Sequence, residues 1–163
     1  MSPKTRGAVP ATGLEAPPWH TVATAAVRRL HQICFARSCA VVGKRGLTPL
    51  QYGVMVYLSD KSGSPGIEQS VLADRLNIDR NTASAVVEQM VKLGVVSREV
   101  NGADRRARLL ALTAKGEKVY DELLPKFRAA NSEILAPLSP AEKTQFMNLL
   151  TRVIEGNLPR QIQ

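Results

Sequence analysis

The sequence predicts a mainly α-helical protein with a small β-hairpin. Through most of the 163 residues, apolar side chains recur at spacings of three and four, which is typical of helices with one buried face. Two short segments rich in β-branched and leucine residues flank a polar stretch that opens with Asn-Gly, and these predict the hairpin. The length fits one domain with appended helices, and a hydrophobic content of 44% is sufficient for a core.

The first 60 residues predict an arm and two helices. Residues 1–18 hold four of the ten prolines and no hydrophobic periodicity, so we expect a flexible N-terminal arm. Apolar residues at helical spacing from Trp19 to Gly43 predict a long amphipathic helix. Thr48-Pro49-Leu50-Gln51 combines an N-cap, proline at the first helical position and a capping-box glutamine, which predicts a second helix that runs to Lys61.

Two shorter helices follow the Ser-Gly-Pro loop at 61–66. The first has its apolar residues at Ile67, Val71, Leu72 and Leu76 and ends near Asn77. Asp79 caps the second helix, whose apolar residues are Ala83, Val86, Val87 and Met90, and Gly94 follows its end. Two short helices joined by a tight turn are typical of a helix-turn-helix.

The remaining chain predicts the hairpin and two further helices. The strands are Val95–Val100 and Leu109–Leu112, with the polar, basic tip 101–108 between them. Thr113 begins the next helix, which we expect Pro125 to bend. Ser139-Pro140-Ala141-Glu142 is a second capping box, and the helix after it is expected to bury Phe146, Leu149, Leu150 and Val153.

This order of elements predicts a winged helix-turn-helix over 47–112, with a recognition helix at 79–93 and a wing at 95–112. Residues 19–46 and 113–158 form a helical region, and 159–163 a tail. The helices from the two chain ends have more apolar surface than one winged domain can cover. We therefore expect this helical region to form a homodimer.

The charge pattern indicates binding to duplex DNA. The net charge of +8 favours a polyanionic partner, and an aromatic content of 4% disfavours a binder of single strands. In a winged helix-turn-helix, the second helix enters the major groove and the hairpin reaches the minor groove. Asp104 is expected to orient Arg106. The predicted DNA-contacting residues are Gln69, Ser70, Arg80, Asn81, Thr82, Ser84, Ala85, Gln89, Arg105, Arg106 and Arg108.

Most of the excess positive charge lies outside this region. Residues 1–46 hold seven basic residues against Glu15 alone, whereas in residues 71–112 seven basic residues are opposed by five acidic ones. The DNA-binding prediction therefore depends on where a few arginines are placed, and the basic arm would add only non-specific phosphate contacts.

Several segments together resemble the MarR family of bacterial transcriptional regulators. They are Leu47-Thr48-Pro49-Leu50-Gln51-Tyr52, Leu72-Ala73-Asp74-Arg75-Leu76, Asp79-Arg80-Asn81-Thr82, Leu93-Gly94-Val95-Val96-Ser97-Arg98, Asp104-Arg105-Arg106-Ala107 and Leu112-Thr113-Ala114-Lys115-Gly116. The resemblance covers residues 19–156, and Val91-Lys92-Leu93 departs from it by carrying less charge before the glycine. It implies a homodimeric repressor on a pseudo-palindromic operator.

The resemblance also implies a small effector. Family members commonly bind an aromatic carboxylate or a phenol between the dimer helices and the DNA-binding lobe, and this ligand releases the DNA. The run from Arg28 to Ile33 resembles the branch that controls aromatic or nicotinate-type catabolism. The residues that would line the ligand site are Trp19, His20, His31, Arg37 and Tyr52.

Two alternatives have their own signals. A redox-sensing regulator would use Cys34, although its place on the apolar stripe favours a buried hydrophobic role, and Cys39 is too distant around the helix for a disulfide. A winged-helix protein-interaction module would lack DNA binding, but its wing would be apolar. No cofactor, metal site or catalytic constellation is expected, nor a membrane span or secretion signal. We expect a cytoplasmic protein, on the nucleoid when bound to DNA.

Overall fold

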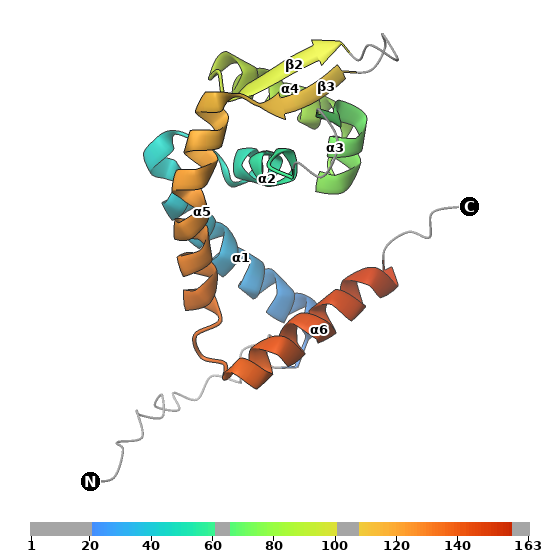
Figure 1. The fold of residues 1–163 in the computed structure, drawn as a ribbon. Helices are drawn as coiled ribbons and strands as arrows, with labels where there is room; N and C mark the ends of the chain where they lie inside the picture. Colours follow the sequence, from blue (N-terminus) through green and yellow to red (C-terminus); the bar gives the residue numbers. More distant parts are fainter. Residues whose placement is uncertain (1–20, 61–65, 101–107, 158–163) are drawn as a thin grey trace. The chain divides into compact units, whose positions relative to one another are not determined.

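The computed structural model describes residues 21–60, 66–100 and 108–157 (Figure 1). The chain divides into two compact units, Met1–Ile33 and Cys34–Gln163. The described part of the first unit is helical from Ala23 onward. Helix α1 (Ala23–Val42) begins there and continues into the second unit, which holds all other elements.

Local signals set where α1 ends and where α2 (Pro49–Leu58) begins. A short 3₁₀ turn, η2 (Gly43–Arg45), follows α1 and ends at Gly46, whose φ of 66° lies in the left-handed region that glycine tolerates. Thr48 Oγ1 accepts a hydrogen bond from Gln51 N at 3.2 Å, and Gln51 Oε1 accepts one from Thr48 N at 2.9 Å. The predicted capping box is confirmed.

The helix-turn-helix consists of α3 (Gln69–Leu76) and α4 (Arg80–Lys92), as predicted. Asn77 makes the turn between them with a left-handed φ of 51°. Asp79 Oδ1 accepts hydrogen bonds from the backbone N–H groups of Asn81 and Thr82, both at 2.9 Å. Gly94, with φ 70°, lies just past the end of α4. Both boundaries of α4 therefore follow from residues next to them.

The predicted hairpin is present as part of a larger sheet. β2 (Val96–Val100) pairs antiparallel with β3 (Arg108–Leu112), with Val96 opposite Leu112. A third strand, β1 (Ile67–Glu68), pairs with the other edge of β3, giving the order β1-β3-β2.

Strand β1 corrects the prediction for Ile67, which its spacing places in the following helix. The chain at Gly66 runs so close to β3 that a Cβ there would lie 2.8 Å from the carbonyl oxygen of Leu110. This close approach brings Ile67 opposite Leu110 across the sheet. The helical spacing of Ile67 to Val71 is misleading because pairing with a distant strand outweighs the local pattern.

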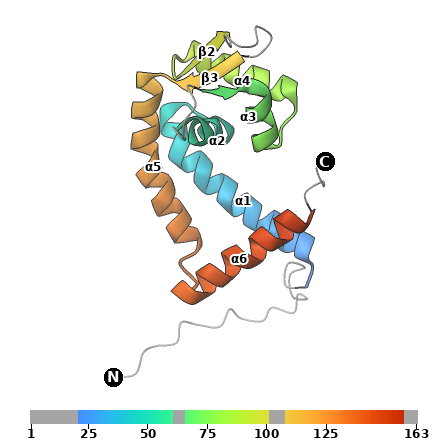
Figure 2. The same cartoon turned by 45° about the vertical axis from the view of Figure 1, so that its right-hand side comes forward.

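Helix α2 lies at the centre of the core, between α3 on one side and α5 (Ala114–Ile134) on the other (Figure 2). Its Val54, Met55 and Leu58 are buried. The other fully buried large side chains include Leu72, Val87, Met90, Leu110 and Leu123, from α3, α4, β3 and α5. The core of this unit thus joins the helix-turn-helix, the sheet and the first half of α5.

Helix α5 is continuous across Pro125, and the expected bend stays a prediction. Its N-cap is Thr113, whose Oγ1 accepts from Gly116 N at 3.1 Å and donates to the carbonyl oxygen of Gly94 at 2.7 Å. The start of α5 is therefore tied to the turn that follows α4.

Helix α6 (Pro140–Asn157) begins with the predicted capping box, in which Ser139 N donates to Glu142 Oε2 at 2.8 Å. The predicted burial of its apolar stripe is wrong for the single chain. No residue of α6 is buried: Phe146 and Leu150 are half-buried, and Leu149 and Val153 are 48% and 61% exposed. Periodicity predicts which face is apolar, but burial also requires an element that covers that face.

None of the described helices combines the length and apolarity needed to cross a membrane.

We expect the N-cap of α4 to make the thermal stability of the protein depend on pH. Hydrogen bonds from the hydroxyl and backbone N–H of Thr82 lower the pKa of Asp79 below its ordinary 3.8. A group with a lowered folded pKa stabilises the protein above its unfolded pKa, and this stabilisation is lost as the pH falls through the folded value. Asp79→Ala should therefore lower the Tm at pH 7, and the difference from wild type should shrink at a pH well below the usual carboxyl value of about 4.

Thermal melts followed by circular dichroism at several pH values check this expectation. Glu155→Ala, which removes an exposed carboxylate from the last turns of α6, serves as the control and should leave the Tm close to that of wild type. A Tm difference for Asp79→Ala that is the same at neutral and at acidic pH would show that the carboxylate charge has no part in the cap.

Candidate nucleic-acid interface

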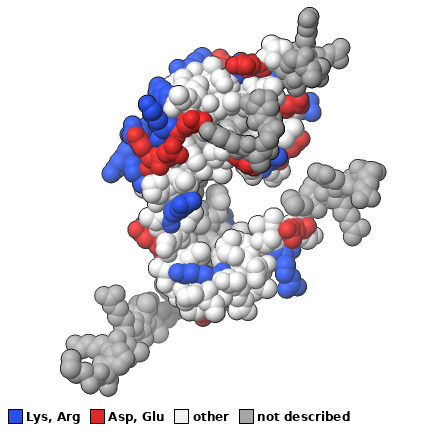
Figure 3. Space-filling view, in the orientation of Figure 1, with Lys and Arg blue, Asp and Glu red and all other residues white. Residues whose placement is uncertain are grey.

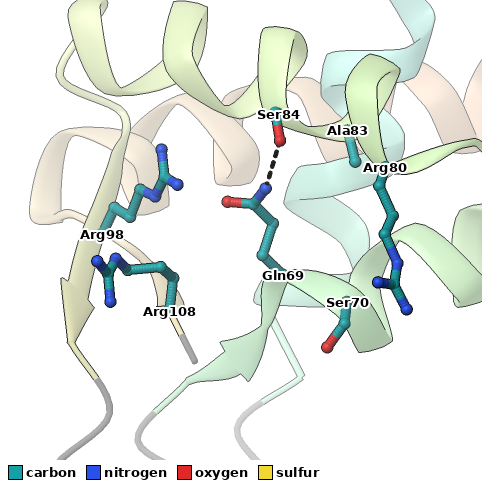
Figure 4. Close-up of a pocket in the computed structure, with 7 residues that line it drawn as sticks. All are labelled: Gln69, Ser70, Arg80, Ala83, Ser84, Arg98 and Arg108. Carbon is teal, nitrogen blue, oxygen red and sulfur yellow. Dashed lines mark hydrogen bonds between the residues drawn. The ribbon is translucent and has the colours of Figure 1, made fainter. Parts of the chain in front are cut away.

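A concave site of about 250 Å³ lies between the start of α3, the first half of α4 and the two longer strands (Figure 4). Among the described residues, seven line it: Gln69, Ser70, Arg80, Ala83, Ser84, Arg98 and Arg108. Three of them are arginines and none is acidic. The site therefore favours an anionic group such as a phosphate.

The α4 side of this site follows from the amphipathic pattern of the helix. Ala83, Val87 and Met90 are buried and hold α4 against the core, which leaves Arg80 exposed. Ser84 Oγ accepts a hydrogen bond from Gln69 Nε2 at 2.8 Å, and this bond joins the two helices of the helix-turn-helix at the site.

Gln69 also presents an acceptor that the described residues leave unsatisfied. Its Oε1 is buried and has no hydrogen-bond partner among them. In Figure 4 this oxygen points away from α4, toward the side on which Arg98 and Arg108 lie. A buried acceptor without a partner is unfavourable, so a donor that entered the site would be bound there.

The strand side of the site depends on the register of the sheet. Arg98 lies two residues after Val96, and Arg108 two residues before Leu110, and Val96 and Leu110 are both fully buried. Because residues i and i+2 share one face of a strand, both arginines lie on the face that packs against the helices, at its end toward the wing tip. Figure 4 shows their side chains next to each other.

The structure brings together five of the predicted DNA-contacting residues: Gln69, Ser70, Arg80, Ser84 and Arg108. Asn81 and Ala85 are exposed on α4 outside this site, and the hydroxyl of Thr82 donates to Asp79 as part of the cap. Arg105, Arg106 and the orienting residue Asp104 lie outside the described residues. Sequence reasoning missed Arg98, although its spacing of two from the apolar Val96 was a usable signal.

Gln89 is predicted to contact DNA, but the structure gives it another contact. Its Oε1 accepts a hydrogen bond from Gln51 Nε2 at 3.3 Å, so the side chain turns toward the start of α2. It lines a different, mainly apolar groove together with residues of α1 and α2. The assignment of Gln89 to the DNA surface thus has no support from the geometry of the concave site.

The predicted ligand-binding residues are not gathered in one place by the described contacts. Trp19 and His20 lie outside the described residues, and His31 belongs to the first compact unit. Arg37 forms an ion pair with Glu133 of α5. Tyr52 is buried and stacks on Phe127 with ring centroids 3.6 Å apart. Burial of its side chain, and to a lesser extent the neighbouring Tyr120, raises the pKa of Tyr52. The effector site stays a prediction.

Cys34 and Cys39 are both half-buried free thiols.

The charged side chains on the face drawn in Figure 3 are mixed in sign. Basic and acidic side chains lie interspersed over the upper part of the face drawn in Figure 3, while the surface over α6 is mostly uncharged. Among the described residues, a local arrangement of three arginines characterises the concave site.

Comparison with known proteins supports a regulatory role. The model of the MarR family matches residues 45–107. Transcriptional regulator HosA of Escherichia coli O127:H6 is 37% identical over 108 residues, which cover 66% of this chain and 78% of HosA. The transcriptional activatory protein BadR of Rhodopseudomonas palustris is 30% identical over 116 residues, 71% of this chain and 66% of BadR.

Solved structures share the fold. The PcaV transcriptional regulator of Streptomyces coelicolor, in complex with its natural ligand, superimposes with a TM-score of 0.73 at 28% identity, covering 87% of this chain and 98% of PcaV. The S. aureus MepR structure, a complex with DNA, has a TM-score of 0.77 at 19% identity, covering 83% of this chain and 98% of MepR. At that identity, the MepR comparison bears on the fold alone.

Proposed function

Because the chain belongs to the MarR family, whose members are transcriptional regulators and not enzymes, we propose that it binds an operator in duplex DNA. The observation that carries this proposal is the concave site in which Arg80, Arg98 and Arg108 surround Gln69. Arginines beside an amide and hydroxyl groups suit a surface that neutralises phosphates and forms hydrogen bonds with base edges. In this proposal residues 47–112 are the DNA-binding region, with α4 in the major groove.

The DNA-binding form is proposed to be a homodimer held together by residues 19–46 and 113–158. Helix α6 supports this proposal, since Met147, Leu149, Val153 and Ile154 are all about half exposed or more in the single chain. A second copy that covered these side chains would remove apolar surface from water. Two-fold symmetry then requires a pseudo-palindromic operator with half-sites roughly 34–36 Å apart.

The regulator is proposed to be a cytoplasmic repressor that a small aromatic acid or phenol releases from its operator. The structure of PcaV with its natural ligand, at 28% identity, supports a ligand-responsive mechanism. Such a ligand lowers DNA affinity only if it binds the DNA-free arrangement more tightly than the DNA-bound one. A thermal-shift screen of aromatic acids tests this part of the proposal, because a ligand that binds the folded state raises its apparent stability.

The wing provides a direct test of DNA binding. An operator is first selected from random duplexes with the wild-type protein, and binding is then measured by gel shift. Arg106→Ala should weaken operator binding by about 1–3 kcal/mol, because an arginine at the wing tip would occupy the electronegative minor groove.

Arg152→Ala, an exposed change on α6, is the control for loss of a positive charge elsewhere and should bind like wild type. If the affinity and the salt dependence of Arg106→Ala also equal those of wild type, the wing does not contact DNA. Failure of the wild-type protein to select any duplex would contradict the proposed function as a whole.

A further inference from the structure

The turn that follows α4 is hydrogen-bonded to the start of α5 through three successive carbonyl groups. The carbonyl of Leu93 accepts from Lys115 Nζ at 2.7 Å, and that of Gly94 accepts from the hydroxyl of Thr113, also at 2.7 Å. The carbonyl of Val95 accepts from the backbone N–H of Thr113 at 3.2 Å. We call these three hydrogen bonds the α4–α5 clamp.

The clamp completes the C-terminus of α4. The last carbonyl groups of an α-helix have no partner within the helix. In α4 the turn itself satisfies two of them, through hydrogen bonds of 2.9 and 3.1 Å from the backbone N–H groups of Gly94 and Val95. The carbonyl of Leu93 lies beyond these local bonds and accepts from the side chain of Lys115 on a different helix. Lys115 therefore caps the end of α4.

The position of Lys115 in its own helix supports this role. Lys115 is the second residue of α5, whose N-terminus carries a partial positive charge, so a cation there is unfavourable for α5. The C-terminus of α4 carries a partial negative charge, where a cation is favourable. The distance of 2.7 Å from Lys115 Nζ to the Leu93 carbonyl oxygen is typical of a charge-assisted hydrogen bond. The charge of Lys115 thus stabilises α4 rather than the helix that carries it.

Lys92 is the basic residue in the last turn of α4 itself, and its contact is of another kind. Its ammonium forms an ion pair of 2.9 Å with Glu88, one turn earlier on the same helix. A hydrogen bond from Lys92, together with its charge, lowers the pKa of Glu88. An ion pair within one helix cannot fix the direction of that helix relative to another element, whereas the clamp can.

The direction of α4 matters because its first half carries Arg80 and Ser84 of the concave site. The helix has 13 residues and is therefore about 20 Å long, so a tilt of about 5° at its C-terminus would move its N-terminus by about 1.7 Å. Such a displacement is enough to break a hydrogen bond with a base edge. The buried side chains of α4 hold it against the core, but apolar packing is non-directional.

We propose that Lys115 is a positioning residue whose hydrogen bond to Leu93 sets the orientation of α4 relative to α5, and thereby the ability of α4 to distinguish its operator from other duplexes. In this proposal Lys115 does not contact DNA. The inference rests on the proposed function and deepens it, because it makes specificity depend on a residue outside the concave site.

Three variants test this role in gel shifts with the selected operator and with a random duplex of equal length. The specificity ratio is the operator affinity divided by the affinity for the random duplex. Lys115→Met removes the donor and its charge and should lower this ratio by about fivefold. Lys118→Met removes the same charge from an exposed position about one turn later in α5 and should leave the ratio within about twofold of wild type. Lys115→Arg keeps a charged donor and should also stay within about twofold.

Two other roles of Lys115 predict different results. If Lys115 bound a phosphate, Lys115→Met would weaken binding of both duplexes equally and lower the salt slope of non-specific binding by about 0.9. If Lys115 only stabilised the fold, both affinities would fall by the same factor, because less of the protein would be competent to bind. Either result would overturn the proposal, as would an unchanged ratio or an equal loss in Lys118→Met.

Amide hydrogen exchange without DNA separates this inference from the proposed function. NMR follows the amides of Gly94 and Val95, whose hydrogen bonds close the end of α4. Lys115→Met should speed their exchange about fivefold through local opening, and Lys118→Met should not. Faster exchange in a protein that selects no operator would remove the proposed function and keep Lys115 as the residue that orients α4. Operator binding with unchanged exchange and an unchanged ratio would keep the proposed function and remove the role of Lys115.

Discussion

Replacing Gly116 by alanine is expected to destabilise the protein more than the same replacement at any other described glycine. Gly116 is buried in the first turn of α5, where a Cβ would lie 2.0 Å from the carbonyl oxygen of Val95 and 3.3 Å from Leu112 Cδ2. The carbonyl of Val95 also accepts the backbone N–H of Thr113 at 3.2 Å, so it cannot move away without breaking that bond. The start of α5 would have to separate from the sheet.

We expect a loss of at least about 3 kcal/mol in the free energy of unfolding, because the obstructing atoms are backbone and cannot rotate away as a flexible side chain can. Urea denaturation followed by circular dichroism measures it. Wild type and variant are compared at equal protein concentration, since dimerisation would make apparent stability depend on concentration.

Gly156→Ala is the matched control. It adds the same methyl group in α6, where no described atom outside the adjacent helix backbone lies within 4 Å of the new Cβ. Alanine is the better helix former, so the control should be neutral or more stable by up to about 1 kcal/mol. If Gly116→Ala were as stable as Gly156→Ala, the close packing of α5 on the chain at Val95 would be incorrect.

Removing both strand arginines is expected to abolish most operator binding. Arg98→Ala with Arg108→Ala takes two guanidinium groups from the concave site and leaves Arg80 as the remaining cation among the described residues that line it. Each arginine in contact with DNA contributes about 1–3 kcal/mol, so the double variant should bind at least about 30-fold more weakly, and more if both interactions are strong. The slope of log affinity against log salt should fall by about 0.9 for each phosphate that an arginine no longer neutralises.

Gel shifts at several salt concentrations, with the operator selected by the wild-type protein, measure both quantities. Arg75→Ala is the control, because Arg75 is exposed on α3 and does not line the concave site. It should change affinity by less than about twofold, as for a surface charge at some distance from the DNA. Double lysine substitution at 98 and 108 should restore the salt slope, because the charge is retained, but only part of the affinity, because lysine lacks the planar fork of arginine. Unchanged affinity and slope in the double alanine variant would exclude this site as the DNA contact.

Sequence reasoning located the secondary structure well where the signals are local. The capping boxes at Thr48 and Ser139, the cap at Asp79 and the glycine after α4 all form hydrogen bonds or turns within a few residues. Such interactions depend on neighbours in the chain, so their residue types and spacing are sufficient to predict them. Gln69, Ser70, Arg80 and Ser84 of the concave site were predicted because they lie on the two helices of the helix-turn-helix, and Arg108 because it ends the basic tip of the hairpin.

The sequence by itself thus determined the N-caps of α2, α4 and α6, the helix-turn-helix, the hairpin and the resemblance to the family. Only the tertiary structure decided that Ile67 joins the sheet, that Arg98 lies beside Arg108, and that Gln89 faces Gln51. It also showed that the apolar face of α6 is not covered within the single chain. Each of these outcomes depends on a partner many residues away or on an element that fails to cover a surface. Periodicity and propensity describe the residues of one segment, whereas register and packing determine which other segments those residues contact.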